Sequence, residues 1–112
     1  MKYHSRKTTI DGITFDSRKE AQRYVELKTL ETAGRISHLV LQPEFVLIPS
    51  FKKNGKTFRK TVYRADFSYL DKDGKYIVED VKSPITAKEP TYRLKKKLFE
   101  YTYPELTIKE VI

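Results

Sequence analysis

The sequence contains no cysteine, no tryptophan and only one methionine among its 112 residues. The missing cysteine excludes disulfide bonds, thiol catalysis and a cysteine-bound zinc ion, and it fits a reducing compartment. No apolar run approaches the length of a membrane span, and the N-terminus lacks a signal-peptide core, so we expect no membrane partner. The length fits one domain, residues 1–112, in which residues 1–7 form a basic tail that we expect to be mobile.

Acidic residues are absent from one stretch of a basic chain. Residues 51–64 carry six lysines and arginines and no acid, and the whole chain has a net charge of +8. Residues 1–19 and 88–97 are also basic, whereas residues 65–87 carry five acids against three lysines. A polyanion, most commonly nucleic acid, is therefore the first partner to consider. Ordinary solvated charge is the alternative for each basic stretch.

Turn signals and apolar spacing predict a short N-terminal hairpin followed by a helix. Asp11-Gly12 is a hairpin-turn sequence within residues 8–15. Asp16 or Ser17 then caps a helix, and Glu20 stands three residues after Ser17, as in a capping box. Gly34 ends this helix. Its expected apolar face consists of Ala21, Tyr24, Val25, Leu27 and Leu30.

The rest of the chain predicts a mixed sheet with helices packed on it. Pro43 marks an edge or a bulge in the first strand, and a basic loop surrounds Asn54-Gly55. The last helix should present Leu94, Leu98 and Tyr101 on its apolar side. The fold class is therefore α/β, with a mixed sheet. Its expected elements are strands at 39–48, 58–70 and 75–82, a helix at 91–103 and a strand at 106–112 that forms a βαβ unit with the third strand.

Two carboxylates on neighbouring strands form the main candidate site. A three-residue loop over 72–74 would place Asp66 opposite Asp80 and Arg64 opposite Lys82, whereas a four-residue loop would make the two aspartates diagonal neighbours. Like charges directly opposite one another destabilise a sheet, and a divalent cation between them would relieve the repulsion. Mutual salt bridges on an exposed face are the alternative. By strand alternation Glu79 should point to the other face.

Tyr63-Arg64-Ala65-Asp66-Phe67, followed by residues 77–82 with Asp80 and Lys82, resembles the PD-(D/E)XK nuclease superfamily. Ala65 stands where the motif's proline would be. The chain is also similar to short phage-encoded members of that superfamily without assigned function, through residues 15–20, 42–45, the two motif strands and residues 92–98. The resemblance implies a restriction-endonuclease-like αβββαβ core in a phage or bacterial protein located in the host cytoplasm.

The same resemblance implies site residues and a cofactor. Asp66 and Asp80 would bind Mg²⁺ or Mn²⁺, and Lys82 would assist the attacking water. Many members add a glutamate from the first helix, and Glu20 stands at that position, where it can also serve only as a helix cap. Gln42 and Glu44 share one face of their strand and can reach the edge of the site, although ordinary surface polarity is the simpler explanation for both.

These observations lead to a metal-dependent deoxyribonuclease, with branched or recombination DNA as candidate substrates. A non-catalytic nucleic-acid-binding module that keeps the fold is the alternative, and a protein adaptor using tyrosine-rich faces is a third hypothesis. Cutting both strands would need two sites, so a homodimer is expected. The residues expected to contact DNA are basic: Lys52, Lys53, Lys56, Arg59, Lys60, Arg64, Lys96 and Lys97.

Overall fold

The computed structural model describes residues 6–112, so residues 1–5 of the predicted tail lie outside the described range. In chain order the elements are β1 (Thr8–Ile10), β2 (Ile13–Phe15), α1 (Arg18–Thr32), β3 (Ser37–Leu41), β4 (Glu44–Ile48), β5 (Phe51–Lys53), β6 (Lys56–Phe58), β7 (Thr61–Arg64), β8 (Phe67–Leu70), β9 (Tyr76–Val81), the 3₁₀ turn η1 (Thr86–Lys88), α2 (Pro90–Thr102) and β10 (Ile108–Val111). No helix in this part of the chain is long and apolar enough to cross a membrane.

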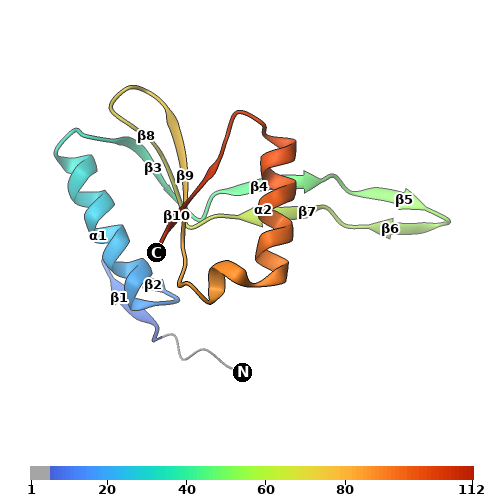
Figure 1. Ribbon diagram of the computed structural model, residues 1–112, viewed down its shortest axis with the longest axis horizontal. Coiled ribbons are helices and arrows are strands. Elements are labelled where there is room, and N and C mark those ends of the chain that lie inside the picture. The colour runs from blue at the N-terminus through green and yellow to red at the C-terminus, as the bar shows by residue number, and fades with distance from the viewer. Residues whose placement is uncertain (1–5) are drawn as a thin grey trace.

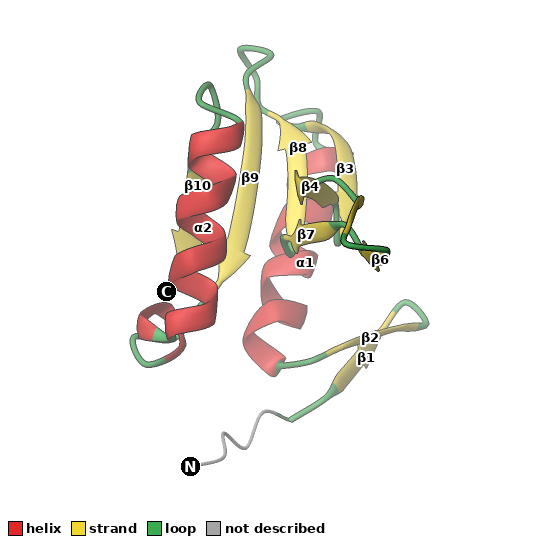
Figure 2. Cartoon of the chain, turned by 90° about the vertical axis from the view of Figure 1, so that its right-hand side faces the viewer, coloured by secondary structure: helices red, strands yellow, loops and turns green. Residues whose placement is uncertain are grey.

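A four-stranded sheet in the order β10-β9-β8-β3 forms the centre of the molecule. β10 runs parallel to β9, whereas the other neighbours are antiparallel, so the predicted mixed sheet and its β9-α2-β10 connection are confirmed. The two helices lie on opposite faces of this sheet (Figures 1 and 2). One core cluster packs under α1 around Leu27 and Phe67, and a second packs under α2 around Val78 and Phe99.

Helix α1 begins and ends where the sequence predicts. The Ser17 side chain accepts a hydrogen bond from the Glu20 backbone N–H, and Gly34 follows the C-cap with a φ of 76°. Its buried face is narrower than predicted, because Val25 and Leu30 are exposed. The helix buries the predicted Ala21, Tyr24 and Leu27, together with Glu20. A carboxylate therefore stands at the start of the buried face.

The two long strands predicted at 39–48 and 58–70 are broken and bent. The first divides into β3 and β4 at Gln42-Pro43, and the second divides at Arg59-Lys60 and at Ala65-Asp66. Hydrogen bonds cross the bend, from Gln42 N–H to the Asp66 carbonyl (2.9 Å) and from Ala65 N–H to the Pro43 carbonyl (3.1 Å). Pairing with β8 ends there and β4 pairs with β7 instead. The bend therefore places Asp66 where the four-stranded sheet gives way to a two-stranded ribbon.

The basic loop predicted around Asn54-Gly55 is a hairpin, not an irregular loop. β5 and β6 pair antiparallel, with Phe51 opposite Phe58 and Lys53 opposite Lys56. Asn54 and Gly55 have φ values of 51° and 75°, as a two-residue hairpin turn requires. Because Asn-Gly is the strongest short-range hairpin signal, the sequence did carry this information. The hairpin extends the β4–β7 ribbon into an arm that projects beyond α2 (Figure 1).

Helix α2 packs through a different face from the one predicted. Leu94 is 55% exposed and Tyr101 is 85% exposed, whereas Tyr92 and Phe99 are buried. Phe99 contacts the rings of Phe45, Tyr63 and Tyr103 in an aromatic cluster that attaches α2 to β4 and β7. The prediction was wrong for Leu94 and Tyr101 and right for Leu98, which is partly buried against this cluster. Burying large rings against the ribbon outweighs burying the rest of the predicted row.

Candidate active site

The β8–β9 hairpin has the predicted register. Phe67 lies opposite Glu79 and Leu70 lies opposite Tyr76. The loop of three residues closes with a hydrogen bond from Asp71 N–H to the Lys75 carbonyl (2.8 Å), and Gly74 has a φ of 79°. The regular pairing ends at Phe67 and Glu79. Beyond it the Asp66 backbone N–H donates to the Glu79 carbonyl at 3.0 Å, so Asp66 lies beside the Glu79-Asp80 segment but does not form a regular cross-strand pair with Asp80.

Asp66 and Asp80 are connected through the backbone of the strands. The Asp66 backbone N–H donates to Asp80 Oδ1 at 3.1 Å, and the Val81 backbone N–H donates to Asp66 Oδ2 at 2.7 Å. Each carboxylate therefore has one oxygen fixed by a peptide N–H. Within residues 6–112 the second oxygen of each accepts no hydrogen bond, which leaves two hard oxygen atoms free for a ligand.

The candidate residues open onto two clefts that meet at Lys82. One cleft, of about 550 Å³, is lined by Asp16, Glu20, Asp66 and Lys82 among others. The second, of about 410 Å³, is lined by Asp80, Arg64 and Tyr92 together with Lys82. The fold thus brings Glu20 and Asp66 to one cleft and Asp80 to the other, with Lys82 shared by both.

Lys82 is held by contacts from both helices. Its ammonium lies 4.2 Å from the centroid of the Tyr92 ring, a cation–π contact. The Tyr92 hydroxyl donates to Glu110 Oε2 at 2.7 Å, which fixes the ring. The Lys19 ammonium donates to the Lys82 backbone carbonyl at 3.0 Å and attaches the start of α1 to the end of β9. The Lys82 side chain is therefore directed by Tyr92.

Burial raises the pKa of all three candidate carboxyl groups. For Glu20 the pKa reaches about 7, because burial and then the nearby charges of Asp66, Asp16 and Asp80 outweigh Lys82. For Asp80 it reaches about 6, since burial outweighs Lys82 and the hydrogen bond from Asp66. Burial also raises the pKa of Asp66 despite the Val81 hydrogen bond. Burial is the largest cause for all three, so each carboxyl group resists ionisation until a cation stabilises its charged form.

The donor set is compatible with a magnesium ion but does not form a complete protein cage. Within residues 6–112 no three side chains of histidine, cysteine, aspartate or glutamate come close enough together to hold a metal ion. Mg²⁺ is commonly held by only one or two carboxylates, with water and substrate phosphate completing its shell. The free oxygens of Asp66 and Asp80 meet that smaller requirement.

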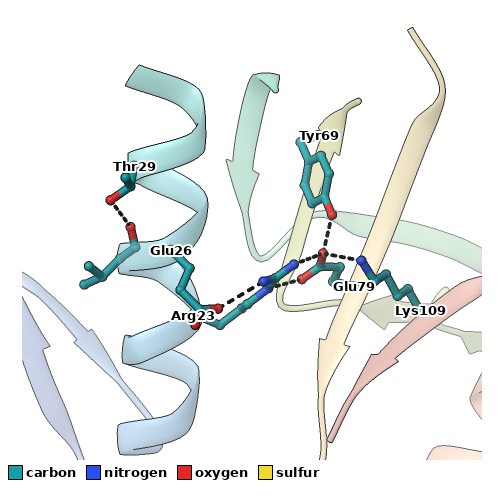
Figure 3. Close-up of polar contacts among 7 residues, drawn as sticks. Arg23, Glu26, Thr29, Tyr69, Glu79 and Lys109 are labelled. Carbon is teal, nitrogen blue, oxygen red and sulfur yellow. Dashed lines mark hydrogen bonds and ion pairs between the residues drawn. The ribbon is translucent and has the colours of Figure 1, made fainter. Parts of the chain in front are cut away.

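Glu79 lies on the opposite face from Asp80, as predicted, and is fully buried. Arg23 donates two hydrogen bonds to it, the Tyr69 hydroxyl donates another, and Lys109 lies 3.7 Å away (Figure 3). Burial alone would raise its pKa, yet the hydrogen bonds from Arg23 and Tyr69 outweigh burial and lower it. Strand alternation indicated the face but gave no signal for these partners.

Gln42 is the site residue that sequence reasoning undervalued. It lines a small cavity of about 160 Å³ together with Glu20 and Asp66. Its φ of 52° is in the left-handed region, which is unfavourable for a residue other than glycine. Its position before Pro43 gave no signal for this backbone, since proline favours an extended conformation in the residue that precedes it. Glu44, the other residue expected to reach the edge of the site, is exposed and forms an ion pair with Arg64.

The predicted DNA-contacting residues lie on two surfaces. Arg64 does not lie opposite Lys82 as predicted, because it pairs with Glu44 of β4. Lys96 forms an ion pair with Glu100 at 2.7 Å and, with Lys97, lines a cleft of about 760 Å³ beside α2. The remaining five all belong to the arm or to its base: Lys52, Lys53, Lys56, Arg59 and Lys60.

A family profile described as "Protein of unknown function (DUF1064)" matches residues 1–112. The chain belongs to the DUF1064 family. Comparison with curated proteins gave no match, and comparison with solved structures gave none. Because the description of DUF1064 assigns no activity, the nuclease resemblance of this DUF1064 protein stays a prediction.

Proposed function

We propose that this protein is a Mg²⁺- or Mn²⁺-dependent deoxyribonuclease with a PD-(D/E)XK site on a restriction-endonuclease-like core. The observation that carries the proposal is the pair of half-buried Asp66 and buried Asp80, bonded through the strand backbone, with Lys82 lining the clefts of both. Raised carboxyl pKa values add support, because a bound cation would stabilise the charged form that burial disfavours. Branched or recombination DNA is the proposed substrate.

Asp66 and Asp80 would hold the metal through their free oxygens, and Glu20 would complete the acidic surroundings. When bound, the ion would supply positive charge to the phosphate undergoing hydrolysis and to the leaving oxygen. Lys82 would orient a water for attack on phosphorus and stabilise the charge that develops on the phosphate oxygens. Glu20, with a pKa of about 7, would accept the proton that this water loses as the bond from phosphorus to the leaving oxygen breaks.

The second candidate is a nucleic-acid-binding module without catalysis, which residues 51–64, with six basic residues and no acid, support without any need for a metal ion. Both functions use the same basic surface, so DNA binding alone does not separate them. The retained set of Asp66, Asp80 and Lys82 favours the enzyme, since a module without catalysis has no need of all three. Cleavage is the property that distinguishes the two.

The test is a cleavage assay on supercoiled, linear, single-stranded and four-way-junction DNA, with Mg²⁺, Mn²⁺ or a chelator. Asp80→Asn should abolish cleavage and leave DNA affinity in chelator close to wild type. Asp73→Asn is the matched control, because Asp73 is exposed in the β8–β9 turn and lies outside both clefts. Cleavage that persists in chelator or in Asp80→Asn overturns the mechanism. DNA binding without cleavage of any substrate supports the binding module.

Hydrolysis of both strands of a duplex requires two sites, and one chain offers one. We therefore propose that the active species is a homodimer. Light scattering with and without DNA measures its mass directly, and a monomer on DNA would restrict the activity to single-strand cuts.

A further inference from the structure

The arm formed by β5 and β6, residues 51–58, is a surface that packing of the domain does not explain. Every residue of the two strands is exposed, although two of them are phenylalanines. The arm projects past α2, away from the sheet and its two core clusters (Figure 1). A protruding element with large exposed apolar side chains usually marks an interaction site.

The two phenylalanine rings form one flat aromatic unit. Phe51 and Phe58 are cross-strand partners whose ring centroids lie 4.8 Å apart, with an angle of 9° between the ring planes. Each residue remains 45% exposed. The contact between the rings stabilises the hairpin, and the exposed remainder leaves aromatic surface accessible to a partner.

Positive charge surrounds this aromatic unit. Lys53 and Lys56 are cross-strand partners on the same face of the arm as the two rings, because strand side chains alternate. Lys52 lies on the other face, and Arg59 and Lys60 stand at the base. Residues 51–64 contain no acid, so the arm repels a second copy of itself and attracts a polyanion.

We propose that the arm binds unpaired bases of DNA, by stacking them on Phe51 and Phe58 while its lysines contact the flanking phosphates. Proteins that bind single strands combine aromatic side chains for stacking with positive charge along the backbone, and the arm has both on one face. Paired bases inside a duplex do not offer their faces for stacking. The inference rests on the proposed function and names its substrate class, DNA with single-stranded or branched segments.

The test measures fluorescence anisotropy of a labelled single strand, a blunt duplex of the same length and a four-way junction, all in chelator so that no cleavage occurs. The variant Phe51→Leu/Phe58→Leu keeps apolar contact between the strands but removes the flat ring surface. We expect its single-strand affinity to fall about tenfold or more while its duplex affinity changes less than about threefold. Tyr101→Leu is the control, since Tyr101 is an 85% exposed aromatic residue of α2 away from the arm.

Equal affinities of the double leucine variant and the wild type for the single strand overturn the proposal, as does an equal loss on single strand and duplex. Circular dichroism and the unfolding midpoint establish that the variant is folded, and the arm lies outside both core clusters. Cleavage is measured separately. A wild type that binds single strands through the rings but cuts nothing contradicts the nuclease and leaves this inference standing. Cleavage by a wild type whose single-strand affinity does not depend on the rings supports the nuclease and overturns this inference.

Discussion

The guanidinium of Arg23 in α1 donates hydrogen bonds of 2.8 and 2.7 Å to the two carboxylate oxygens of Glu79 in β9. This bidentate pair connects the first helix to β9 (Figure 3). Because strand side chains alternate, it lies on the face of the sheet opposite to the Asp80 side chain. It sets the distance between α1, with Glu20, and the end of β9, with Lys82. The pair therefore supports the geometry of the site without lining either cleft.

Removing Arg23 should destabilise the protein strongly. Arg23→Ala leaves the fully buried Glu79 carboxylate without its main partner, and we expect the free energy of unfolding to fall by about 3 kcal/mol in urea denaturation. Glu26→Ala removes only the exposed partner of Arg23 and should change the free energy of unfolding by less than about 0.5 kcal/mol. Similar losses in the two variants would contradict a structural role for the buried pair.

The metal-free protein should be more stable in mild acid than in mild base. Burial raises the pKa of Glu20 to about 7 and of Asp80 to about 6, so the folded state binds these protons more tightly than the unfolded chain. Their stabilising contribution is full below the ordinary values near 4 and is lost as the pH rises through 6 and 7. In chelator we expect the free energy of unfolding to fall by about 4 kcal/mol between about pH 5 and about pH 8.

Asp80→Asn should reduce that pH dependence by about a third, because Glu20 still titrates, whereas Asp73→Asn should keep the wild-type slope. Magnesium added at the higher pH should recover stability in the wild type and not in Asp80→Asn, because a ligand that binds only the folded state stabilises it. A wild-type unfolding free energy that does not change over this range would show that these carboxyl groups are not buried as described.

The ring of Tyr92 should matter more to activity than its hydroxyl. Tyr92→Phe keeps an aromatic ring beneath the Lys82 ammonium. Tyr92→Leu removes the cation–π contact, so the Lys82 side chain is no longer held in place. We expect the leucine variant to lose about fivefold in kcat with little change in KM, and the phenylalanine variant to stay within about twofold of wild type. Equal losses in both would instead assign the effect to the hydrogen bond with Glu110.

The lysines of the arm should determine the salt dependence of DNA binding. The triple variant Lys52→Gln/Lys53→Gln/Lys56→Gln should bind all DNA forms more weakly and reduce the slope of log K against log salt by about 2 to 3, since each phosphate contact contributes about 0.9. Lys72→Gln/Lys75→Gln removes exposed charge at the β8–β9 turn instead and should leave the slope nearly unchanged. A reduction of equal size in both variants would mean that total charge, not the arm, governs binding.

The backbone conformation of Gln42 should lower the stability of the fold, and its side chain should contribute to cleavage. Its backbone has a φ of 52°, so Gln42→Gly should be more stable than Gln42→Ala by about 1 kcal/mol in urea denaturation. Both variants lose the side chain beside Glu20 and Asp66, and we expect similar reductions in cleavage from both. A glycine variant no more stable than the alanine variant would argue against strain at this position.

The sequence predicted the parts of the site that depend on local chemistry. Gly74 and the three-residue loop set the β8–β9 register, and that register brings Asp66 close enough for its backbone N–H to bond the Asp80 side chain. Ser17 determined where α1 begins, and hence where Glu20 lies. Strand alternation separated Glu79 from Asp80. In each case the information lies within a few residues of the feature it determines.

The missed features depend on contacts between distant segments. Helix α2 has two apolar rows, one with Leu94 and Tyr101 and another with Tyr92 and Phe99, and only the position of the ribbon decides which is buried. Arg23 could not be assigned to Glu79, because a helical pattern does not say which strand the helix crosses. The bend at Gln42 and Asp66 likewise follows from a change of strand partners.

The projecting arm has a consequence for how the protein behaves in solution. The radius of gyration is 15.8 Å, whereas a compact chain of this length would have about 13 Å, and the longest extent is 53 Å. The monomer should therefore diffuse slowly for its mass and elute early from a sizing column, at a volume between those of a compact monomer and a compact dimer. Shortening the arm at its Asn54-Gly55 tip should move the elution volume toward that of a compact protein without changing the number of chains in the particle.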